Sequence, residues 1–291
     1  MSHRPVLYCT HRPRPPLDRF VDQLWYWEGV PPAHDKDRLL PGGSCGLIVN
    51  LIEDENRLYS GPDDGVVNRL PGAVLSAAYS RYFVIDTREQ RANVGVRFHP
   101  GGTWPFFDPA GDELRDQHVA LRDLWGSAGD TLRERLLAAP TPRAKLALLE
   151  AELLERAIRP LHRRAEVDFA LARLSAAPND HSIAMLSEHV GLSARRFTRL
   201  FTLEVGLTPK VYARIQRFQH ALDCMLQSNG SDWTDVAQTC GYFDQSHFIR
   251  ECRSLSGFTP TELAARRIGD SDPSTGMNRN CISAHAVPKM P

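Results

Sequence analysis

Two stretches in the C-terminal third of the chain combine side chains that hydrogen-bond to nucleic-acid bases with a glycine suited to a sharp turn. Gly191 precedes the first set of side chains and Gly241 precedes the second. The candidate contacts are Arg195, Arg196, Thr198 and Arg199 in the first stretch, and Gln245, Ser246, His247 and Arg250 in the second. Arginine pairs bidentately with guanine and glutamine with adenine, while hydroxyls and histidine reach bases or phosphates. The sequence therefore predicts two surfaces that bind double-stranded DNA.

The residues around each glycine predict a helix, a turn and a second helix. Ser182 and Ser193 are suited to cap two helices, and Phe197 and Phe201 would face inward from the second one. The same order recurs later in the chain, where Asp244 stands in the place of Ser193. Helix-turn-helix motifs place their second helix in the major groove of DNA.

A long helix is expected between the two units. The phrases Gly206-Leu207-Thr208-Pro209 and Gly257-Phe258-Thr259-Pro260 each allow glycine to close one helix and proline to begin the next. A helix from Pro209 to Gln227 has 19 residues and a length of about 28 Å. One turn of DNA is roughly 34 Å long. One chain is therefore expected to read two successive major-groove segments.

Composition excludes several other classes of protein. The chain has 291 residues, and its 35 lysines and arginines balance its 35 aspartates and glutamates, so it does not bind nucleic acid or lipid by bulk charge. It has no apolar run of membrane-spanning length and no signal-peptide segment, which predicts a cytoplasmic protein. The 6 cysteines include no C-x-x-C and no closely spaced Cys/His pair, which argues against disulfides and a zinc site.

The spacing of Pro, Gly and apolar residues along the chain predicts an α+β protein of two domains. Up to about residue 126, Pro and Gly separate short apolar runs, such as Gly46 to Ile52, Ala73 to Asp86 and Val94 to Phe98, which favours a β-sandwich or barrel. The expected boundaries are 1–129 for a β-barrel-like domain, 130–162 for a helical linker, 163–267 for the DNA-binding domain and 268–291 for a disordered tail.

The linker helices carry an apolar stripe with two alternative explanations. Leucines recur at helical spacing from Leu132 to Leu153, and Pro140 and Pro142 divide the segment into two helices. The stripe would either pack against its own domain or form the seam of a homodimer.

The C-terminal features resemble the AraC/XylS family of bacterial transcription regulators over about residues 166–266. The most specific matches are Gly241-Tyr242, the run from Asp244 to Arg250, and Gly257-Phe258-Thr259-Pro260. The resemblance implies base or phosphate contacts for the eight side chains named above, RNA polymerase as a further partner, and activation as the mode of regulation. Ser187 departs from the family's usual alanine, and Cys252 from a common aromatic residue.

The N-terminal half resembles a sensor half found in a subset of these regulators. The resemblance rests on Trp25-Tyr26-Trp27, Leu40-Pro41-Gly42-Gly43 and the run from Arg97 to Gly102. It implies a cupin-like β-barrel that binds a small organic effector, followed by dimerising helices. The candidate ligand-binding residues are Trp25, Trp27, Arg97 and His99, and the barrel would be lined by some of the aromatic residues Trp25, Trp27, Phe83, Phe98 and Trp104. Alternatively, these aromatics simply fill the barrel.

Two other classes of function remain as alternatives. A cupin-like metal enzyme fused to a helix-turn-helix domain would need a metal site, but the N-terminal histidines include no H-x-H pair, and Gly43-Ser44-Cys45-Gly46 lacks the G-x-S-x-G order. No catalytic residue, metal ligand or cofactor is therefore predicted, and the protein is not expected to be an enzyme. A protein-binding adaptor would not need two Arg- or Gln-bearing helices after matching turns. DNA binding that falls steeply with salt distinguishes the regulator from the adaptor.

Overall fold

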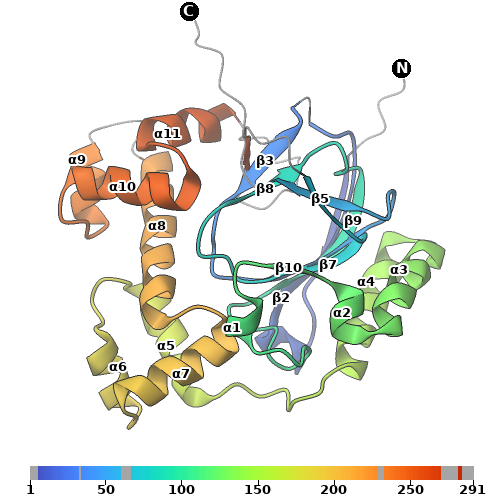
Figure 1. Ribbon diagram of the computed structural model, residues 1–291, viewed down its shortest axis with the longest axis horizontal. Coiled ribbons are helices and arrows are strands. Elements are labelled where there is room, and N and C mark those ends of the chain that lie inside the picture. Colours follow the sequence, from blue (N-terminus) through green and yellow to red (C-terminus); the bar gives the residue numbers. More distant parts are fainter. Residues whose placement is uncertain (1–5, 33, 60–66, 228–232, 270–280, 284–291) are drawn as a thin grey trace, which may run out of the picture.

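Residues 7–120 form two antiparallel β-sheets, and residues 165–269 form a helical domain beside them (Figure 1). The computed structural model describes residues 6–32, 34–59, 67–227, 233–269 and 281–283. The predicted α+β architecture is confirmed, with a β-rich N-terminal region and an all-α C-terminal domain. Within the described residues the sheets remain two separate sheets and do not join into the closed barrel that was expected.

The larger sheet has six strands and the smaller sheet has five. In spatial order the larger sheet consists of β1 (Leu7–His11), β2 (Val21–Glu28), β9 (Ala92–Phe98), β4 (Gly46–Asn50), β7 (Ala73–Ser76) and β10 (His118–Ala120). The smaller sheet consists of β11 (Cys281–Ser283), β3 (Lys36–Leu39), β8 (Phe83–Asp86), β5 (Asn56–Tyr59) and β6 (Val67–Leu70). A short 3-10 helix, η1 (Leu17–Arg19), lies between β1 and β2.

One predicted strand is divided in the structure. The apolar run from Ala73 to Asp86 forms β7 in one sheet and β8 in the other. Between them the chain leaves both sheets, and the Tyr82 N–H donates to the Leu255 carbonyl of the helical domain at 3.1 Å. A contact between distant parts of the chain therefore interrupts a segment whose local sequence favours a continuous strand.

Side-chain alternation along β2 separates a cavity from a core. Trp25 and Trp27 face the space between the two sheets. Leu24 and Tyr26 are buried on the opposite face of the larger sheet, where α4 packs. Successive residues of a strand point to opposite faces, so one short aromatic segment supplies both layers.

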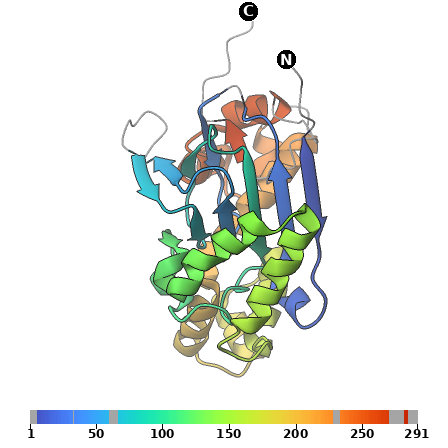
Figure 2. The same cartoon turned by 90° about the vertical axis from the view of Figure 1, so that its right-hand side faces the viewer.

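Three helices follow the sheets, and two of them cover the outer face of the larger sheet (Figure 2). They are α2 (Leu121–Trp125), α3 (Ser127–Ala138) and α4 (Pro142–Glu155), preceded by the short α1 (Gly111–Leu114). The leucines of the apolar stripe are at most 5% exposed, namely Leu132, Leu136, Leu146, Leu149 and Leu153. The dimer-seam hypothesis for this stripe is therefore wrong, because these side chains are already buried within their own domain. The segment predicted as a separate linker contributes to the N-terminal core.

Two arginines hold the segment between α4 and α5 against the N-terminal region. The Arg159 guanidinium lies 4.1 Å from the Trp104 ring centre and donates to the Asp108 carbonyl at 2.8 Å. Arg163 donates to the Pro100 carbonyl at 2.9 Å. Trp104 therefore packs beneath this connection, and its prediction as a wall of the ligand cavity is wrong.

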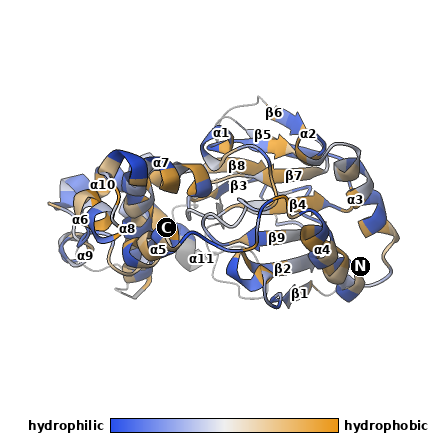
Figure 3. Ribbon diagram, turned by 90° about the horizontal axis from the view of Figure 1, so that it is seen from below, coloured by the Kyte–Doolittle hydropathy of each residue, from blue (hydrophilic) through white to orange (hydrophobic). Residues whose placement is uncertain are grey.

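The C-terminal domain consists of seven helices in the described residues and forms a lobe on the side of the sheets away from α3 and α4 (Figure 3). They are α5 (Ala165–Ala176), α6 (Ile183–His189), α7 (Ala194–Val205), α8 (Pro209–Gln227), α9 (Trp233–Thr239), α10 (Gln245–Ser256) and α11 (Pro260–Gly269). The predicted long helix from Pro209 to Gln227 is confirmed. Among the described residues, no helix has the length and apolarity needed to span a bilayer.

The segment predicted as a disordered tail contains a described strand. Residues Cys281–Ser283 form β11 and pair with β3 in antiparallel register, with Ile282 opposite Arg38. β11 thus extends the smaller sheet beyond β3, which the polar composition of the tail did not indicate. Residues 270–280 and 284–291 of the predicted tail lie outside the described residues.

Gly95 makes the aromatic wall of the cavity possible, and this can be tested. A Cβ at Gly95 would lie 2.7 Å from the Trp25 ring and 2.3 Å from the Leu47 carbonyl oxygen. We expect Gly95→Ala to lower the free energy of unfolding by about 2–3 kcal/mol, measured by urea denaturation. Gly46→Ala is the matched control on the neighbouring strand, because its Cβ would lie at an ordinary 3.5 Å from Ile48. Equal effects of the two substitutions would contradict this explanation.

Candidate DNA interface and ligand cavity

The first helix-turn-helix unit consists of α6 and α7. The Leu192 N–H donates to the Ser187 carbonyl at 2.9 Å, and Gly191 between them has a left-handed backbone with φ of 68°. Ser193 then caps α7 by accepting a hydrogen bond from the Arg196 N–H at 3.3 Å. Ser187 is buried, and its hydroxyl donates to a carbonyl of its own helix at 2.9 Å. This departure from alanine is therefore accommodated without an unpaired polar group.

The second unit, α9 and α10, repeats these bonds. The Tyr242 N–H donates to the Ala237 carbonyl at 2.8 Å, and Gly241 has a φ of 70°. Asp244 caps α10 by accepting a hydrogen bond from the His247 N–H at 2.6 Å. Each unit thus joins residues five positions apart across a left-handed glycine and caps the next helix two or three residues later. The matched geometry confirms that the chain contains two helix-turn-helix units.

The predicted DNA-contacting side chains gather on the outward sides of α7 and α10. The exposed members are Arg195, Arg196 and Arg199 on α7, and Gln245, Ser246 and Arg250 on α10, while Thr198 and His247 are half-buried. Arg195, Arg196, Arg199 and Arg250 form no ion pair within the described part of the chain. Four guanidinium groups therefore remain available to an external anion or base edge.

His247 differs from the other predicted contacts because it is engaged within the protein. Its Nδ1 accepts a hydrogen bond from the Phe243 N–H at 3.4 Å, and its ring packs edge-on against Tyr242 with centres 5.4 Å apart. Its Nε2 lies 3.8 Å from Glu251. These contacts orient the turn before α10.

Phe243 is a surface residue that sequence reasoning missed. It lies in the turn directly before α10 and is 91% exposed. An aromatic ring this exposed at the start of a recognition helix can contact a thymine methyl group or a deoxyribose. Only its position after the turn glycine could have indicated this role from the sequence.

A buried carboxylate fixes α10 on α8. Glu251 is 6% exposed and accepts hydrogen bonds from Arg214 Nε at 2.6 Å and from Arg217 Nη2 at 2.8 Å. Both arginines lie on α8, so the ion pairs connect the second recognition helix to the long helix between the two units. Buried charges are stable only when paired in this way.

Both recognition helices end at a glycine that lies against the N-terminal region. Gly206 ends α7 with φ of 83°, and a Cβ on Gly111 of α1 would lie 2.6 Å from its nitrogen. Gly257 ends α10 with φ of 74°, and its own Cβ would lie 2.5 Å from Arg38 Nη1. Arg38 is buried there, donates to the Ser256 carbonyl at 3.0 Å and stacks on a neighbouring ring. The N-terminal region thus contacts the C-terminal ends of both α7 and α10.

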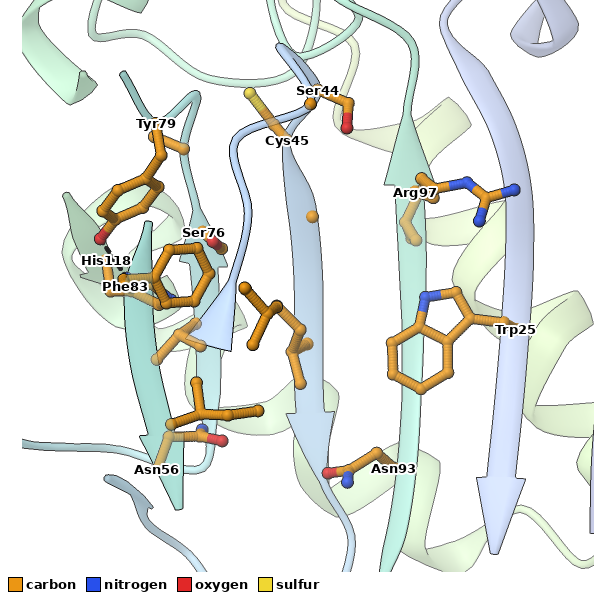
Figure 4. Close-up of a pocket in the computed structure, with 18 of the residues that line it drawn as sticks. Trp25, Ser44, Cys45, Asn56, Ser76, Tyr79, Phe83, Asn93, Arg97 and His118 are labelled. Carbon is orange, nitrogen blue, oxygen red and sulfur yellow. Dashed lines mark hydrogen bonds between the residues drawn. The ribbon is translucent and has the colours of Figure 1, made fainter. Parts of the chain in front are cut away.

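A cavity of about 210 Å³ lies between the two sheets (Figure 4). Its walls are largely apolar and aromatic, as is typical of sites for small organic molecules. The predicted residues Trp25, Trp27, Phe83 and Arg97 line it, together with Tyr79, Asn93 and His118, which sequence reasoning missed. Phe98 lies on the opposite face of β9 and packs against Phe106 and Phe107, so its prediction as a cavity wall is wrong.

Several of the residues that line the cavity carry buried polar or titratable groups. Trp27 Nε1 and Asn93 Oδ1 are buried and have no hydrogen-bond partner. Burial raises the pKa of the Glu89 carboxyl to about 8, so it is largely protonated at neutral pH. Burial lowers the pKa of His118 to about 3, and this neutral ring is hydrogen-bonded to the Tyr79 hydroxyl. Two residues that line the cavity therefore each have a buried polar atom without a hydrogen-bond partner.

The two predicted polar anchors have other positions. Arg97 lines the cavity, but its Nε donates to Asp22 on β2 at 2.5 Å, so its charge is already paired. His99 does not line this cavity. It lies after β9, in a wider cleft of about 550 Å³ between the sheets and α5, where it neighbours Arg163 and Asp168. The prediction of His99 as a ligand anchor in the barrel is therefore wrong, because the chain leaves the sheet at Phe98.

The loop at the mouth of the cavity is also bonded to the helical domain. Pro41 and Gly42 line the cavity. Their carbonyls accept hydrogen bonds from Gln219 Nε2 at 2.7 Å and Gln216 Nε2 at 3.2 Å, and both glutamines lie on α8. One loop therefore touches both the cavity and the helix that carries the second helix-turn-helix unit.

Comparison with known families divides the chain in the same way as the fold. Residues 186–266 match a family described as "Helix-turn-helix domain", and residues 9–120 match a "Domain of unknown function (DUF6597)". The probable transcriptional regulator LumQ of Photobacterium leiognathi is 34% identical over 80 residues, which are 28% of this chain and 32% of that protein. The arabinose operon regulatory protein of Salmonella typhimurium is 26% identical over 175 residues, 56% of this chain and 60% of that protein. The matches thus span about one third to three fifths of these relatives.

Solved structures show weaker likeness. A structure of ToxT from Vibrio cholerae with a bound unsaturated fatty acid is 9% identical, covers 91% of this chain and 96% of its own, and has a TM-score of 0.41. A DNA-binding transcriptional dual regulator from Escherichia coli K-12 is 21% identical, covers 37% of this chain and 95% of its own, and has a TM-score of 0.31. Scores this low do not bear on the function of the chain.

The Glu251 ion pairs predict a local effect on α10. Glu251→Ala leaves Arg214 and Arg217 facing an empty, partly buried position. We expect the opening free energy of α10, measured by amide hydrogen exchange, to fall by about 2–3 kcal/mol. Glu188→Ala on the exposed surface of α6 is the control and should change exchange by less than about 0.5 kcal/mol. Unchanged exchange in the Glu251 variant would show that the pairs do not hold the helix.

Proposed function

The C-terminal part of this chain is a helix-turn-helix domain of the AraC/XylS family, and from this premise we propose that the protein is a sequence-specific DNA-binding regulator of transcription. The observation that carries the proposal is the pair of matched turns, each followed by a capped helix whose outward side chains are arginine or glutamine. The relatives named above are regulators, which agrees with a protein that has no catalytic role.

Two recognition helices on one chain suit two successive major-groove segments. Arg195, Arg196 and Arg199 on α7 supply contacts to guanine edges or phosphates, and Gln245 and Arg250 on α10 supply contacts to adenine and guanine. α8, which joins the two units, has 19 residues and a length of about 28 Å, close to the roughly 34 Å of one DNA turn. Phe243 adds an apolar contact at the start of α10. This binding mode is a proposal supported by the exposure of these side chains.

We further propose that a small organic molecule binds in the cavity between the sheets. A cavity walled by Trp25 and Phe83 favours a flat apolar group, and the unpaired Trp27 N–H and Asn93 carbonyl favour a ligand with one acceptor and one donor. Since Arg97 is paired with Asp22 and Glu89 is largely protonated, a neutral ligand fits better than an anion.

The loop that contains Pro41 and Gly42 is the route by which such a ligand would affect DNA binding. A ligand that prefers one arrangement of this loop also prefers one position of α8, because Gln216 and Gln219 are bonded to it. The helices that carry the apolar stripe, α3 and α4, pack on the outer face of the larger sheet, whereas this loop is bonded directly to α8. The proposal also includes contact with RNA polymerase and activation of transcription. It further includes a homodimer formed by a surface other than the buried stripe.

Two substitutions test the recognition helices. Arg199→Ala and Arg250→Ala should each weaken binding to the specific site by about 1–3 kcal/mol, roughly 5- to 150-fold, and should relax preference at particular base pairs. The site is first found by genome-wide mapping of bound DNA, and affinities are then measured by titration at fixed salt. Arg122→Ala on α2 is the control, because this exposed arginine lies in the N-terminal region.

If both variants keep the footprint and its base preference, the assignment of the recognition faces is wrong. If binding to DNA is independent of salt while a protein partner is retained, the adaptor alternative is favoured instead.

The loop contacts with α8 can be tested with any metabolite that stabilises the protein in a thermal-shift screen. For such a compound, the double variant Gln216→Ala/Gln219→Ala should keep the thermal shift but lose most of the ligand's effect on DNA affinity. In the unmodified protein we expect the ligand to change the free energy of DNA binding by the roughly 1–3 kcal/mol that is usual for allosteric coupling. In the variant this change should be severalfold smaller. A variant that responds to the compound as fully as the unmodified protein would exclude this route.

A further inference from the structure

Three potential metal ligands meet where the second helix-turn-helix unit packs on α8. His220 and Cys224 lie one helical turn apart on α8, and Cys240 directly follows α9. Their ligand atoms all lie within 4.8 Å of one another. The sequence-based prediction that no histidine and cysteine lie close together is wrong at this point. His220 and Cys224 are four residues apart on one helix face, and tertiary packing brings the third residue to them.

The spacing of these atoms fits a tetrahedral ion. Zinc binds thiolate sulfur at about 2.3 Å and imidazole nitrogen at about 2.0–2.1 Å, so tetrahedral ligand atoms lie about 3.5–3.8 Å apart. The Cys224 Sγ to His220 Nε2 distance is 3.6 Å, which already agrees. The limit of 4.8 Å for the whole set requires side-chain shifts of at most about 1 Å.

We propose that His220, Cys224 and Cys240 bind a thiophilic cation of the Zn²⁺ class. Two thiolates and one imidazole are a soft ligand set that selects such ions over magnesium or calcium. His220 is exposed, Cys224 is half-buried and Cys240 is fully buried, so the site opens to solvent on the histidine side. Three protein ligands leave a fourth position to which water has access.

Hydrogen bonds to its backbone hold Cys240, the most buried of the three proposed ligands, in place. The Cys240 carbonyl accepts a hydrogen bond from Asn179 Nδ2 at 2.8 Å, and its N–H donates to the Val236 carbonyl at 3.0 Å. Cysteine binds zinc as a thiolate, so binding must release protons and strengthen as pH rises.

An ion at this position would connect two elements of the DNA-binding domain. His220 and Cys224 belong to α8, whereas Cys240 lies at the end of α9, the first helix of the second unit, and α9 packs beside α8 (Figure 1). The cluster is separate from the cavity between the sheets and from the outward faces of α7 and α10. A metal ion here would be a second ligand of the protein, bound within the DNA-binding domain. Its binding does not depend on the proposed effector.

Cobalt is the spectroscopic probe for the experiment. The full chain is reduced, freed of metal and titrated anaerobically with Co²⁺, which reports thiolate ligation through sulfur-to-cobalt charge-transfer absorption and tetrahedral geometry through intense d–d bands. We expect saturation at one ion per chain and displacement by one Zn²⁺. Bound Zn²⁺ should also raise the unfolding temperature, because the ion binds the folded state more tightly than the unfolded chain.

Substitutions assign the ligands. Cys224→Ser and Cys240→Ser should each weaken Zn²⁺ binding by more than about a hundredfold, since even the outer hydrogen-bond partners of metal ligands are worth 10- to 100-fold. His220→Gln should weaken it less but change the d–d bands. Cys9→Ser, a half-buried cysteine on β1, is the matched control and should bind as the unmodified protein does.

Two results would overturn the proposal. The first is a cobalt titration of the unmodified protein without charge-transfer absorption, which needs no variant to fold. The second is unchanged Zn²⁺ affinity in Cys240→Ser, which would place any bound ion elsewhere. Neither result affects the DNA-binding proposal, which is judged by Arg199→Ala and Arg250→Ala alone.

Discussion

The close backbone contact between Gly206 and Gly111 is the constraint on which the arrangement of the two domains depends. Neither residue tolerates a Cβ there, because the other chain segment lies at van der Waals distance. Gly257 imposes a similar limit where Arg38 and Tyr82 pack against it. Left-handed glycines that end helices are common, but here they also form the interface. The C-terminal ends of α7 and α10 therefore both lie in close contact with the N-terminal region.

The long helix α8 connects the remaining features. Its first half carries Tyr212, whose ring lies against Gly43, followed by Gln216 and Gln219, which bond to the loop at the cavity. Arg214 and Arg217 on the same helix hold Glu251 of α10. The contacts with the loop at the cavity and the contacts with α10 are therefore made by the same helix. The cysteine and histidine cluster lies farther along the same helix, at its contact with α9.

The cavity exists because the two sheets do not close on each other. Small residues such as Gly95 admit the Trp25 indole, and the remaining space is not filled by Phe98, which points to the other face. Unpaired buried polar atoms cost free energy unless a ligand or water satisfies them. Trp27 Nε1 and Asn93 Oδ1 are two such atoms, and both belong to residues that line the cavity.

Local sequence determined the helix-turn-helix units. Caps such as Ser193 and Asp244, turn glycines such as Gly191, and apolar residues at helical spacing act over a few residues, so their pattern predicted both units and the bounds of α8. The outward positions of the arginines on α7 follow from the same periodicity, because inward positions are occupied by Phe197 and Phe201. These interactions are short-range, and for this reason the sequence alone sufficed.

Tertiary structure decided what depends on contacts between distant residues. The stripe from Leu132 to Leu153 looked equally suited to a dimer or to its own sheet, and only the position of α3 and α4 on that sheet distinguished them. Alternation along β9 placed Arg97 and Phe98 on opposite faces, while the end of the strand sent His99 to another cleft. Cys240 lies near His220 and Cys224 only because α9 packs on α8. Periodicity identifies a buried face but not its partner, since the partner is chosen by the packing of the whole chain.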